Sequence, residues 1–426
     1  MSAAPPLSPA GAQLSPAVAK PAHVPDALVY DFDLFADPSL LATGYDRVLE
    51  IARDTPPVFW SPRNGGQWVL RSHAAVYQAQ REPENFSNAP MRAEDIMAMN
   101  AAMPEGAEKI LIPAPITLDP PLHAVFRKPI QTVFSPKAMA SLKDEVRALA
   151  VELIEDLKPQ GGCEFMAAIA EPLPVTVFLK LFGLPTDQAR VYRDLVLDHL
   201  ASNGNPDPMA TQRRLRRVAD VMKDTIIARR DKREDDILSL LWDAEFDGRP
   251  AELFDLESYA VMLFIAGLDT VYNGMGLGVL HLARHPELQA ELRANPGRIA
   301  AASEEILRRY SFTVPPRFLT RDIEFRGVTM KQGDKALMFL PAADLDAEEF
   351  PDPAAFDLKR ANNVHIAFGV GPHRCLGSHL ARVELQVLYE ELLARLPAFR
   401  LDPAQPVTYH GGHVIGPDTV PLVWDV

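Results

Sequence analysis

The spacing of apolar residues predicts a mostly helical chain with short strands towards both ends. From about residue 136 to 310, apolar side chains recur every three or four positions, which is the period of an amphipathic helix. This period predicts long helices over 139–157, 212–230 and 253–285, and a last helix that ends near residue 396. Proline and glycine separate these segments.

Alternating apolar and polar residues predict strands in three other places. The first is a hairpin over 57–73, with its turn at Asn64-Gly65-Gly66. Short strands are also predicted over 318–341 and in the tail over 406–426. There are no internal repeats. This order of elements indicates a predominantly helical α+β fold, with a single domain over 28–426 and a mobile Pro- and Ala-rich tail over 1–27.

Composition excludes several classes of protein. The net charge of -14 argues against non-specific binding to nucleic acid. Two cysteines cannot build a disulfide framework, which fits a reducing cytoplasm. The first residues lack the pattern of a signal peptide, and the most apolar stretch, 261–282, contains Asp269 and several glycines. We therefore expect a soluble, cytoplasmic protein.

The run Phe368-Gly-Val-Gly-Pro-His-Arg-Cys-Leu-Gly377 carries the most chemical information. Its glycines permit close approach of the backbone to a flat cofactor, and the helix predicted to follow places its positive end near Cys375. Such surroundings favour a thiolate, and a haem iron with one cysteine ligand is the obvious partner. The alternative is a free cysteine that is simply buried before a helix.

A second informative segment, Phe264 to Asn273, lies in the middle of a predicted helix. The small pair Ala266-Gly267 leaves room for a diatomic ligand or a substrate, and the Thr270 hydroxyl can bond back to a carbonyl and open the helix locally. Asp269 and Asn273 are four residues apart and face the same side. The alternative for this segment alone is a helix kink with one satisfied aspartate.

The pattern Phe-x-x-Gly-x-His-x-Cys-x-Gly at 368–377 resembles the haem-binding loop of the cytochromes P450, the haem-thiolate monooxygenases. The resemblance extends from about residue 24 to 426 and is strongest to the bacterial camphor 5-monooxygenase type. The segments that carry it are 28–33, 64–68, 118–121, 267–271, 304–309, 368–382 and 421–425. It implies a triangular helical prism with small β-sheets, haem b as cofactor, and Cys375 as the ligand of the iron.

The resemblance also implies roles for other residues. It assigns oxygen activation and proton delivery to Gly267, Asp269 and Thr270. It assigns haem binding, partly through the propionates, to His123, Arg127, Arg317, Phe368, His373 and Gly377. The family's Glu-x-x-Arg motif, with an arginine before the cysteine loop, corresponds to a structural triad of Glu305, Arg308 and Arg360. From spacing alone, the first two would be an ordinary surface ion pair.

The matched substrate pocket is mostly apolar. Its residues are Met91, Leu111, Ile116, Met262, Ile265, Ala266, Thr313, His413 and Val414. The camphor-type enzyme fixes the ketone of camphor with a tyrosine, and Leu111 takes that position here. We therefore expect a bulky terpenoid or norisoprenoid rather than camphor, with His413 as the one residue able to restore recognition of a ketone.

No flavin or iron–sulfur domain follows Cys375, so electrons are expected from a [2Fe-2S] ferredoxin and its reductase. Arg374 and Arg382, together with Arg127, form a basic face suited to an acidic ferredoxin. A monomer with O2 and a small apolar molecule as substrates is expected. Two alternatives remain at this stage: a peroxygenase driven by peroxide, and a haem-binding sensor or scavenger without catalysis.

Overall fold

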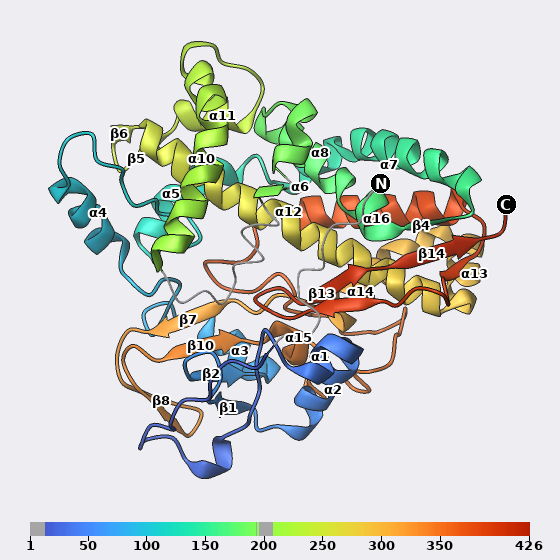
Figure 1. The fold of residues 1–426 in the computed structure, drawn as a ribbon, viewed down its shortest axis with the longest axis horizontal. Coiled ribbons are helices and arrows are strands. Elements are labelled where there is room, and N and C mark those ends of the chain that lie inside the picture. The colour runs from blue at the N-terminus through green and yellow to red at the C-terminus, as the bar shows by residue number, and fades with distance from the viewer. Residues whose placement is uncertain (1–12, 193, 196–207) are drawn as a thin grey trace.

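The computed structural model describes residues 13–192, 194–195 and 208–426. Helices dominate it, as the sequence predicts (Figure 1). Their bounds are α1 Pro38–Thr43, α2 Tyr45–Asp54, α3 His73–Ala79, α4 Ala93–Ala102, α5 Leu122–Gln131, α6 Pro136–Ser141, α7 Lys143–Leu157, α8 Pro172–Phe182, α10 Pro208–Asp231, α11 Ile237–Trp242, α12 Leu253–Arg284, α13 Pro286–Ala294, α14 Ile299–Arg309, α15 Leu340–Ala343 and α16 Ser378–Arg395.

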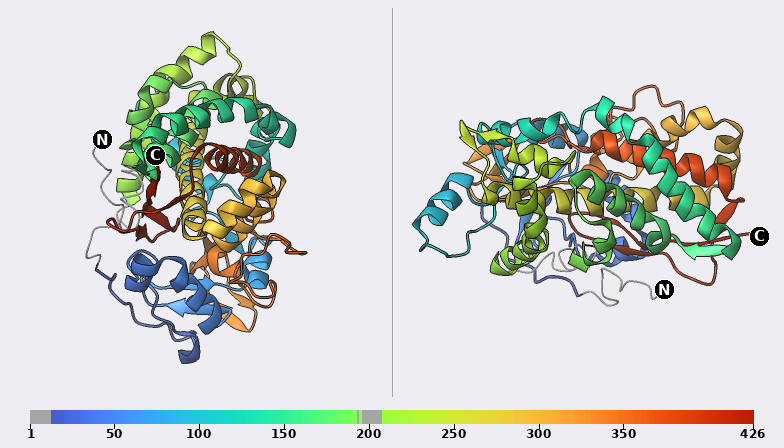
Figure 2. Two further views of the ribbon diagram at one scale, coloured as in Figure 1. Left: turned by 90° about the vertical axis from the view of Figure 1, so that its right-hand side faces the viewer. Right: turned by 90° about the horizontal axis from the view of Figure 1, so that it is seen from above.

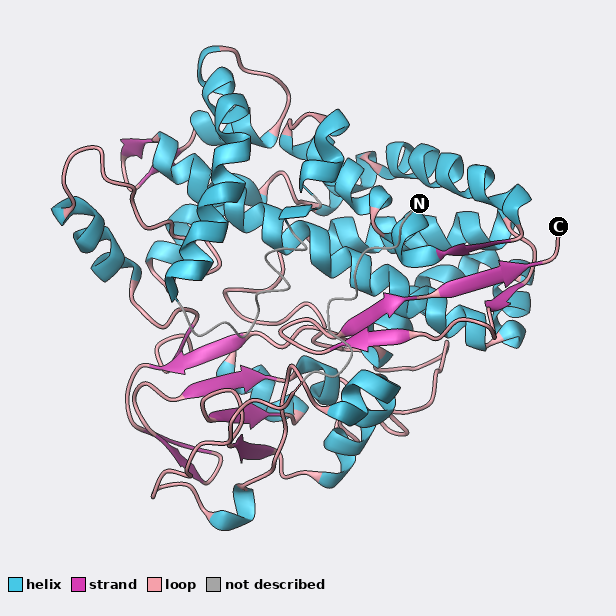
Figure 3. Cartoon of the chain, in the orientation of Figure 1, coloured by secondary structure: helices cyan, strands magenta, loops and turns pink. Residues whose placement is uncertain are grey.

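The strands form small sheets, and the largest of them lies below the long helices in the view of Figure 3. In the largest sheet the order is β1-β2-β10-β7-β3, and β10 runs parallel to β2 while the other pairs are antiparallel. The bounds are β1 Val58–Ser61, β2 Gln67–Leu70, β3 Phe86–Ser87, β4 Gly162–Glu164, β5 Glu245–Phe246, β6 Arg249–Pro250, β7 Pro316–Leu319, β8 Ile323–Phe325, β9 Val328–Met330, β10 Lys335–Met338, β11 Phe399–Leu401, β12 Thr408–His410, β13 Gly416–Thr419 and β14 Pro421–Trp424.

The hairpin predicted over 57–73 is present as β1 and β2. Its turn uses the left-handed region at Asn64, Gly65 and Gly66, with φ of 54°, 85° and 85°. Part of the segment expected to be a mobile tail lies along this hairpin. The Val18 N–H donates to the Pro62 carbonyl at 2.9 Å, and Val24 is buried. Contacts with the domain thus begin before residue 28; residues 1–12 lie outside the described part.

The long helix α12 forms the centre of the core. It begins with a capping box in which Glu252 and Asp255 satisfy each other's backbone N–H groups. The helix is long and apolar enough to cross a membrane, but most of that apolar stretch is buried inside the protein. Helices α8, α10, α14 and α16 pack against it, and β13 covers another part of its surface. It is therefore a core helix that other elements surround.

Segments far apart in the sequence lie side by side in the fold. Seen from the side, the N-terminal elements lie at one end of the molecule and the helices from the middle of the chain at the other (Figure 2). The C-terminal strand β14 pairs with both β11 and β4, so the tail closes onto a segment that precedes it by about 260 residues, as the register Leu422 to Cys163 records. Cys163 is a free, half-buried cysteine in that strand.

Candidate active site

The loop before α16 is tightly folded around Cys375. The Cys375 N–H donates to the Phe368 carbonyl at 2.8 Å, and the Arg374 N–H donates to the Gly371 carbonyl at 3.1 Å. The Gly377 N–H donates to the sulfur, which favours the thiolate, although burial raises the pKa of the thiol overall. The residue as a whole is nevertheless exposed to solvent. The loop thus holds Cys375 in place and leaves it accessible.

Two residues that the sequence did not reveal hold this loop in place. Gln80, which follows α3, accepts the Val370 N–H through Oε1 at 2.8 Å. Gly371 has a φ of 74°, and a Cβ on it would lie 2.4 Å from the Gln80 carbonyl oxygen. Asp344 accepts the Ile366 N–H at 2.7 Å and fixes the start of the loop. Sequence separations of this size leave no local signal for such contacts.

Four basic side chains predicted to bind haem lie close together. His123 and Arg127 lie one turn apart on α5, and the ring of His123 is 4.1 Å from that of His373. Burial lowers the pKa of His373 to about 2, with further lowering by the charges of His123, Arg317 and Arg127. Burial likewise lowers the pKa of Arg317 to about 10. Their mutual electrostatic effects show that the four form one cluster.

This cluster has almost no negative counter-charge among the described residues. Arg317 is only 6% exposed, and Asp119 is the acid whose charge opposes the lowering of its pKa. The Nε2 atoms of His123 and His373 are buried and have no hydrogen-bond partner in the described part of the chain. Unpaired buried donors and cations are costly. The cluster therefore fits an anionic group with several acceptor oxygens, such as a pair of carboxylates.

Asp269 and Thr270, the pair predicted to deliver protons, both lie on α12. The Thr270 hydroxyl donates to the Ala266 carbonyl at 2.9 Å, and the amide of Asn273 donates to the Asp269 carboxylate at 3.0 Å. Burial raises the pKa of Asp269 to about 6, while the charge of His410 and the bond from Asn273 act in the opposite direction. This is the range in which a carboxyl group can both take up and release a proton near neutral pH.

One expectation for this helix needs correction. The helix stays continuous from 253 to 284, so the hydroxyl of Thr270 does not open it. In the direction of a Cβ, Gly267 faces the ring of Phe178, which would lie 2.9 Å from that atom. The absence of a side chain at Gly267 thus permits the close approach of α8 to α12.

Glu305, Arg308 and Arg360 form a buried network. The carboxylate of Glu305 accepts bonds from Arg308 at 2.8 and 2.9 Å and from Arg360 at 3.1 Å. Arg308 also donates to the carbonyls of Asp344, Pro353 and Ala355. Both Glu305 and Arg308 have 0% exposure. The pair is therefore part of the core that supports the segment before the cysteine loop, not a solvated surface bridge.

The two arginines expected to contact a redox partner differ in their surroundings. Arg382 is bound by the Glu304 carboxylate at 2.6 and 2.9 Å and lies 4.5 Å above the ring of Phe368. Its charge is therefore largely compensated, and its position fixes Phe368. Arg374 is exposed, and in the described part of the chain its hydrogen bonds involve its backbone: its N–H donates to Gly371, and its carbonyl accepts from Arg127 at 2.6 Å. Of the two, Arg374 carries the freer positive charge.

The predicted pocket residues come from five separate segments. Leu111 is 1% exposed, and Gln212 on α10 holds its backbone through bonds of 3.1 and 3.3 Å. Thr313 pairs with Val414 across an isolated bridge. Met262, Ile265 and Ala266 follow one another on α12, and Met262 is 7% exposed. Met91 and Ile116, in contrast, are exposed.

His413 cannot restore recognition of a ketone, contrary to expectation. Its Nδ1 lies 2.9 Å from the Val314 carbonyl, which can only accept, so Nδ1 must carry the proton. Burial lowers the pKa of His413 to about 4, so the ring is neutral and Nε2 is a bare acceptor. This residue can accept a bond from a hydroxyl group but has no proton to offer a carbonyl oxygen.

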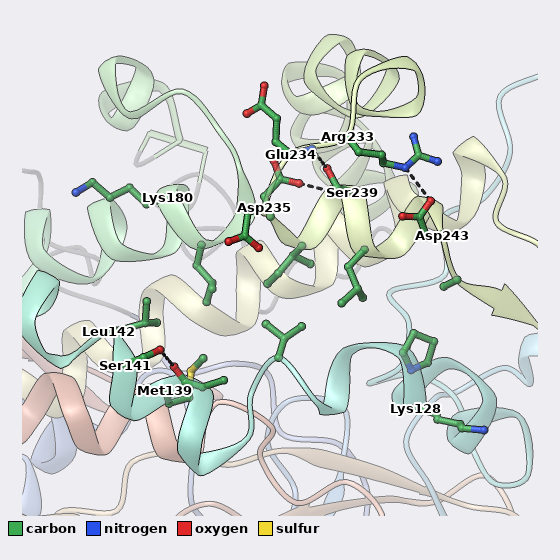
Figure 4. Close-up of a pocket in the computed structure, with 18 of the residues that line it drawn as sticks. Lys128, Met139, Ser141, Leu142, Lys180, Arg233, Glu234, Asp235, Ser239 and Asp243 are labelled. Carbon is green, nitrogen blue, oxygen red and sulfur yellow. Dashed lines mark hydrogen bonds and ion pairs between the residues drawn. The ribbon is translucent and has the colours of Figure 1, made fainter.

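A separate pocket lies between α5–α8 and the segment around α11 (Figure 4). Its volume is about 1320 Å³, and Arg233 and Asp243 form an ion pair of 2.8 Å at its edge. None of the predicted haem, catalytic or substrate residues lines it. It is therefore distinct from the site around Cys375.

Comparison with known proteins assigns the family. The family model for cytochrome P450 matches residues 299–408. The chain is 34% identical to the probable cytochrome P450 127A1 of Sinorhizobium fredii over 413 residues, which cover 95% of this chain and 96% of that protein. The chain belongs to the cytochrome P450 family. This cytochrome P450 is also 29% identical to cytochrome P450-terp of a Pseudomonas species, over 87% of this chain and 91% of the relative.

The solved structure of CYP101J2 matches this cytochrome P450 with a TM-score of 0.84 and 31% identity, over 96% of this chain and 100% of the other. The predicted fold is thereby confirmed. Membership implies a haem cofactor, and the cluster of His123, Arg127, Arg317 and His373 suits its two propionates. When bound, haem supplies the activation of O2, while the protein binds and orients the substrate.

Proposed function

We propose that this cytochrome P450 hydroxylates a bulky apolar terpenoid or norisoprenoid, with O2 and two electrons from a [2Fe-2S] ferredoxin and its reductase. The supporting observation is the composition of the pocket. Leu111 is buried where the camphor-type enzyme has a tyrosine, and His413 has no proton to donate to a ketone. Affinity must then come from apolar contact, at about 25 cal/mol per Å² of buried surface.

Within this proposal, Cys375 holds the haem iron, and His123, Arg127, Arg317 and His373 neutralise the propionates. Phe368 and Gly377 shape the loop that would hold the haem. Asp269 and Thr270 deliver protons to the site of oxygen activation from α12, whose bonds keep both side chains in defined positions. The name of the relative P450-terp is in keeping with a terpenoid substrate. We further propose a cytoplasmic monomer with Arg374 on the docking face for ferredoxin.

A spectral titration tests the substrate class. Ferric enzyme is titrated with camphor, cineole, α-ionone, β-ionone, a methyl-branched fatty acid and a steroid, and the low- to high-spin shift of the Soret band is recorded. We expect the ionones to bind more tightly than camphor because they bury more apolar area. Tightest binding by the fatty acid or the steroid would contradict the terpenoid assignment.

A second experiment tests the electron source and the proton relay. Turnover is measured with ferredoxin, reductase and NADH, and separately with hydrogen peroxide alone. Thr270→Ala should keep haem and substrate binding but divert electrons to peroxide, whereas Thr270→Ser should restore coupling. Efficient turnover with peroxide alone, and no change in coupling in Thr270→Ala, would instead indicate a peroxygenase.

A further inference from the structure

The carboxylate of Asp269 lies on the face of α12 that packs against a short hairpin of β12 and β13. One turn beyond Asp269, Asn273 contacts Gly416 so closely that a Cβ on Gly416 would lie 1.8 Å from Asn273 Oδ1. Gly416 is in turn the register partner of His410 on β12. Helix and hairpin thus meet at Asn273 and Gly416, with His410 on the adjacent strand.

A β-bulge in this hairpin brings Asp418 to His410. The register pairs Thr408 with Thr419 and Tyr409 with Pro417, which leaves Asp418 as the extra residue. Bulges redirect the side chain of the extra residue. Here the Asp418 carboxylate bonds to Nδ1 of His410 at 2.7 Å, although the register partner of His410 is Gly416. The two side chains are only 7% and 4% exposed, so the pair is buried.

Two oxygens of this cluster are buried without a hydrogen-bond partner in the described part of the chain. They are Oδ2 of Asp418 and Oδ1 of Asn273. A buried acceptor without a donor costs about 1–3 kcal/mol, unless a proton or an ordered water satisfies it. The cluster behind Asp269 therefore contains two acceptors that no described donor satisfies.

The other titratable groups near Asp269 are acidic. Burial, together with the charges of Glu164, Asp418, Asp269 and Glu171, raises the pKa of Tyr272 on the same helix. Glu164 on β4 accepts the N–H groups of Met166, Ala167 and Val420, so backbone donors stabilise its charge. Among the described groups that act on Asp269, His410 is the one able to carry a positive charge.

We propose that His410, anchored by Asp418 across the bulge, is a positioning residue for proton delivery: when protonated it places a positive charge behind Asp269 and favours the ionised carboxylate. The proposal rests on the proposed role of Asp269. A positive charge near a carboxylate stabilises the ionised form, so the loss of that charge should raise the pH at which Asp269 releases its proton.

Infrared spectroscopy of the ferric holoenzyme measures the pH at which Asp269 releases its proton. The C=O stretch of protonated Asp269, assigned by its absence in Asp269→Asn, is titrated against pH in the wild type and in His410→Gln. Glutamine keeps hydrogen-bonding capacity without a positive charge. We expect the midpoint to rise by up to about one pH unit, and the pH profile of coupling to move in the same direction. His73→Gln, a buried histidine 3.8 Å from Glu349, is the matched control and should change neither.

A second variant covers the case in which His410→Gln does not fold. His410→Asn is shorter and also removes the charge, and we expect the same rise in the Asp269 midpoint. An unchanged Asp269 midpoint in whichever of the two variants folds would overturn the inference. Unchanged coupling in Asp269→Asn would instead count against the proposed relay itself, so the two failures are distinguishable.

Discussion

Gly371 and Gln80 are in backbone contact across the base of the cysteine loop. A Cβ on Gly371 would lie 2.4 Å from the carbonyl oxygen of Gln80, and Gly371 has a φ of 74°, which favours glycine. The neighbouring Val370 N–H donates to the Gln80 side chain at 2.8 Å. The position of the cysteine thus depends on a contact with the residue that follows α3, 290 residues before Val370 in the sequence.

The first prediction follows from this contact. Gly371→Ala should destabilise the loop by at least about 1–2 kcal/mol from backbone strain alone, and the steric overlap adds to this. We expect weaker haem retention and a smaller fraction of the reduced CO complex with the absorption of a thiolate-ligated haem. Gly297→Ala is the control, because a Cβ there meets nothing within 4 Å. Equal spectra for the two variants would show that the contact is not needed.

The second prediction concerns the buried network of Glu305. Glu305→Gln leaves Arg308 and Arg360 without their negative partner, at a cost of about 3–5 kcal/mol. We expect a large fall in the temperature of thermal unfolding and a parallel loss of haem. Lys331→Ala removes an exposed ion pair with Asp322 and should leave that temperature nearly unchanged. A Glu305→Gln variant as stable as the wild type would refute a supporting role.

The third prediction separates Arg374 from Arg382. Arg374→Gln should raise the apparent KM for ferredoxin and weaken the dependence of the rate on ionic strength, since its charge is exposed. Arg382→Gln should instead alter the Soret spectrum and the unfolding temperature, because Arg382 binds Glu304 and covers Phe368. Arg53→Gln on α2 controls for a general charge effect. If the rate of the wild-type reaction does not depend on ionic strength, the prediction that ferredoxin docks electrostatically at Arg374 is wrong.

Local patterns were enough to predict much of this molecule. The period of α12 predicted its extent to within one residue at its C-terminal end, and the glycine turn predicted the hairpin of β1 and β2. The loop pattern around Cys375 indicated haem because that chemistry depends on neighbouring residues. The Asp269–Asn273 bond also follows from helical spacing, since residues four apart share a face.

Other features depend on contacts between distant segments, which spacing does not encode. The parallel pairing of β2 and β10 joins segments far apart in the chain. Glu305 and Arg308 have the spacing of a surface pair, and only the packing around them shows that they are buried. The tautomer of His413 depends on the Val314 carbonyl, and the compensation of Arg382 depends on Glu304. The last three of these changed an interpretation made from the sequence.

The last prediction tests the position assigned to Leu111. The side-chain amide of Gln212 binds both the N–H and the carbonyl of Leu111. A new side chain at this position should therefore keep the direction of the present one. Leu111→Tyr adds a hydroxyl where the camphor-type enzyme has one, and Leu111→Phe adds the same ring without it. The extra ring costs about 1–3 kcal/mol of packing in both variants, so the comparison between them isolates the hydroxyl. A hydrogen bond to the ketone is worth about 0.5–1.5 kcal/mol, and we therefore expect camphor to bind roughly two- to tenfold more tightly to Leu111→Tyr than to Leu111→Phe. Cineole, an ether of similar size, controls for shape, and Kd values come from the Soret titration. Tight binding of camphor by the wild type, with equal affinities in the two variants, would show that Leu111 does not face the substrate.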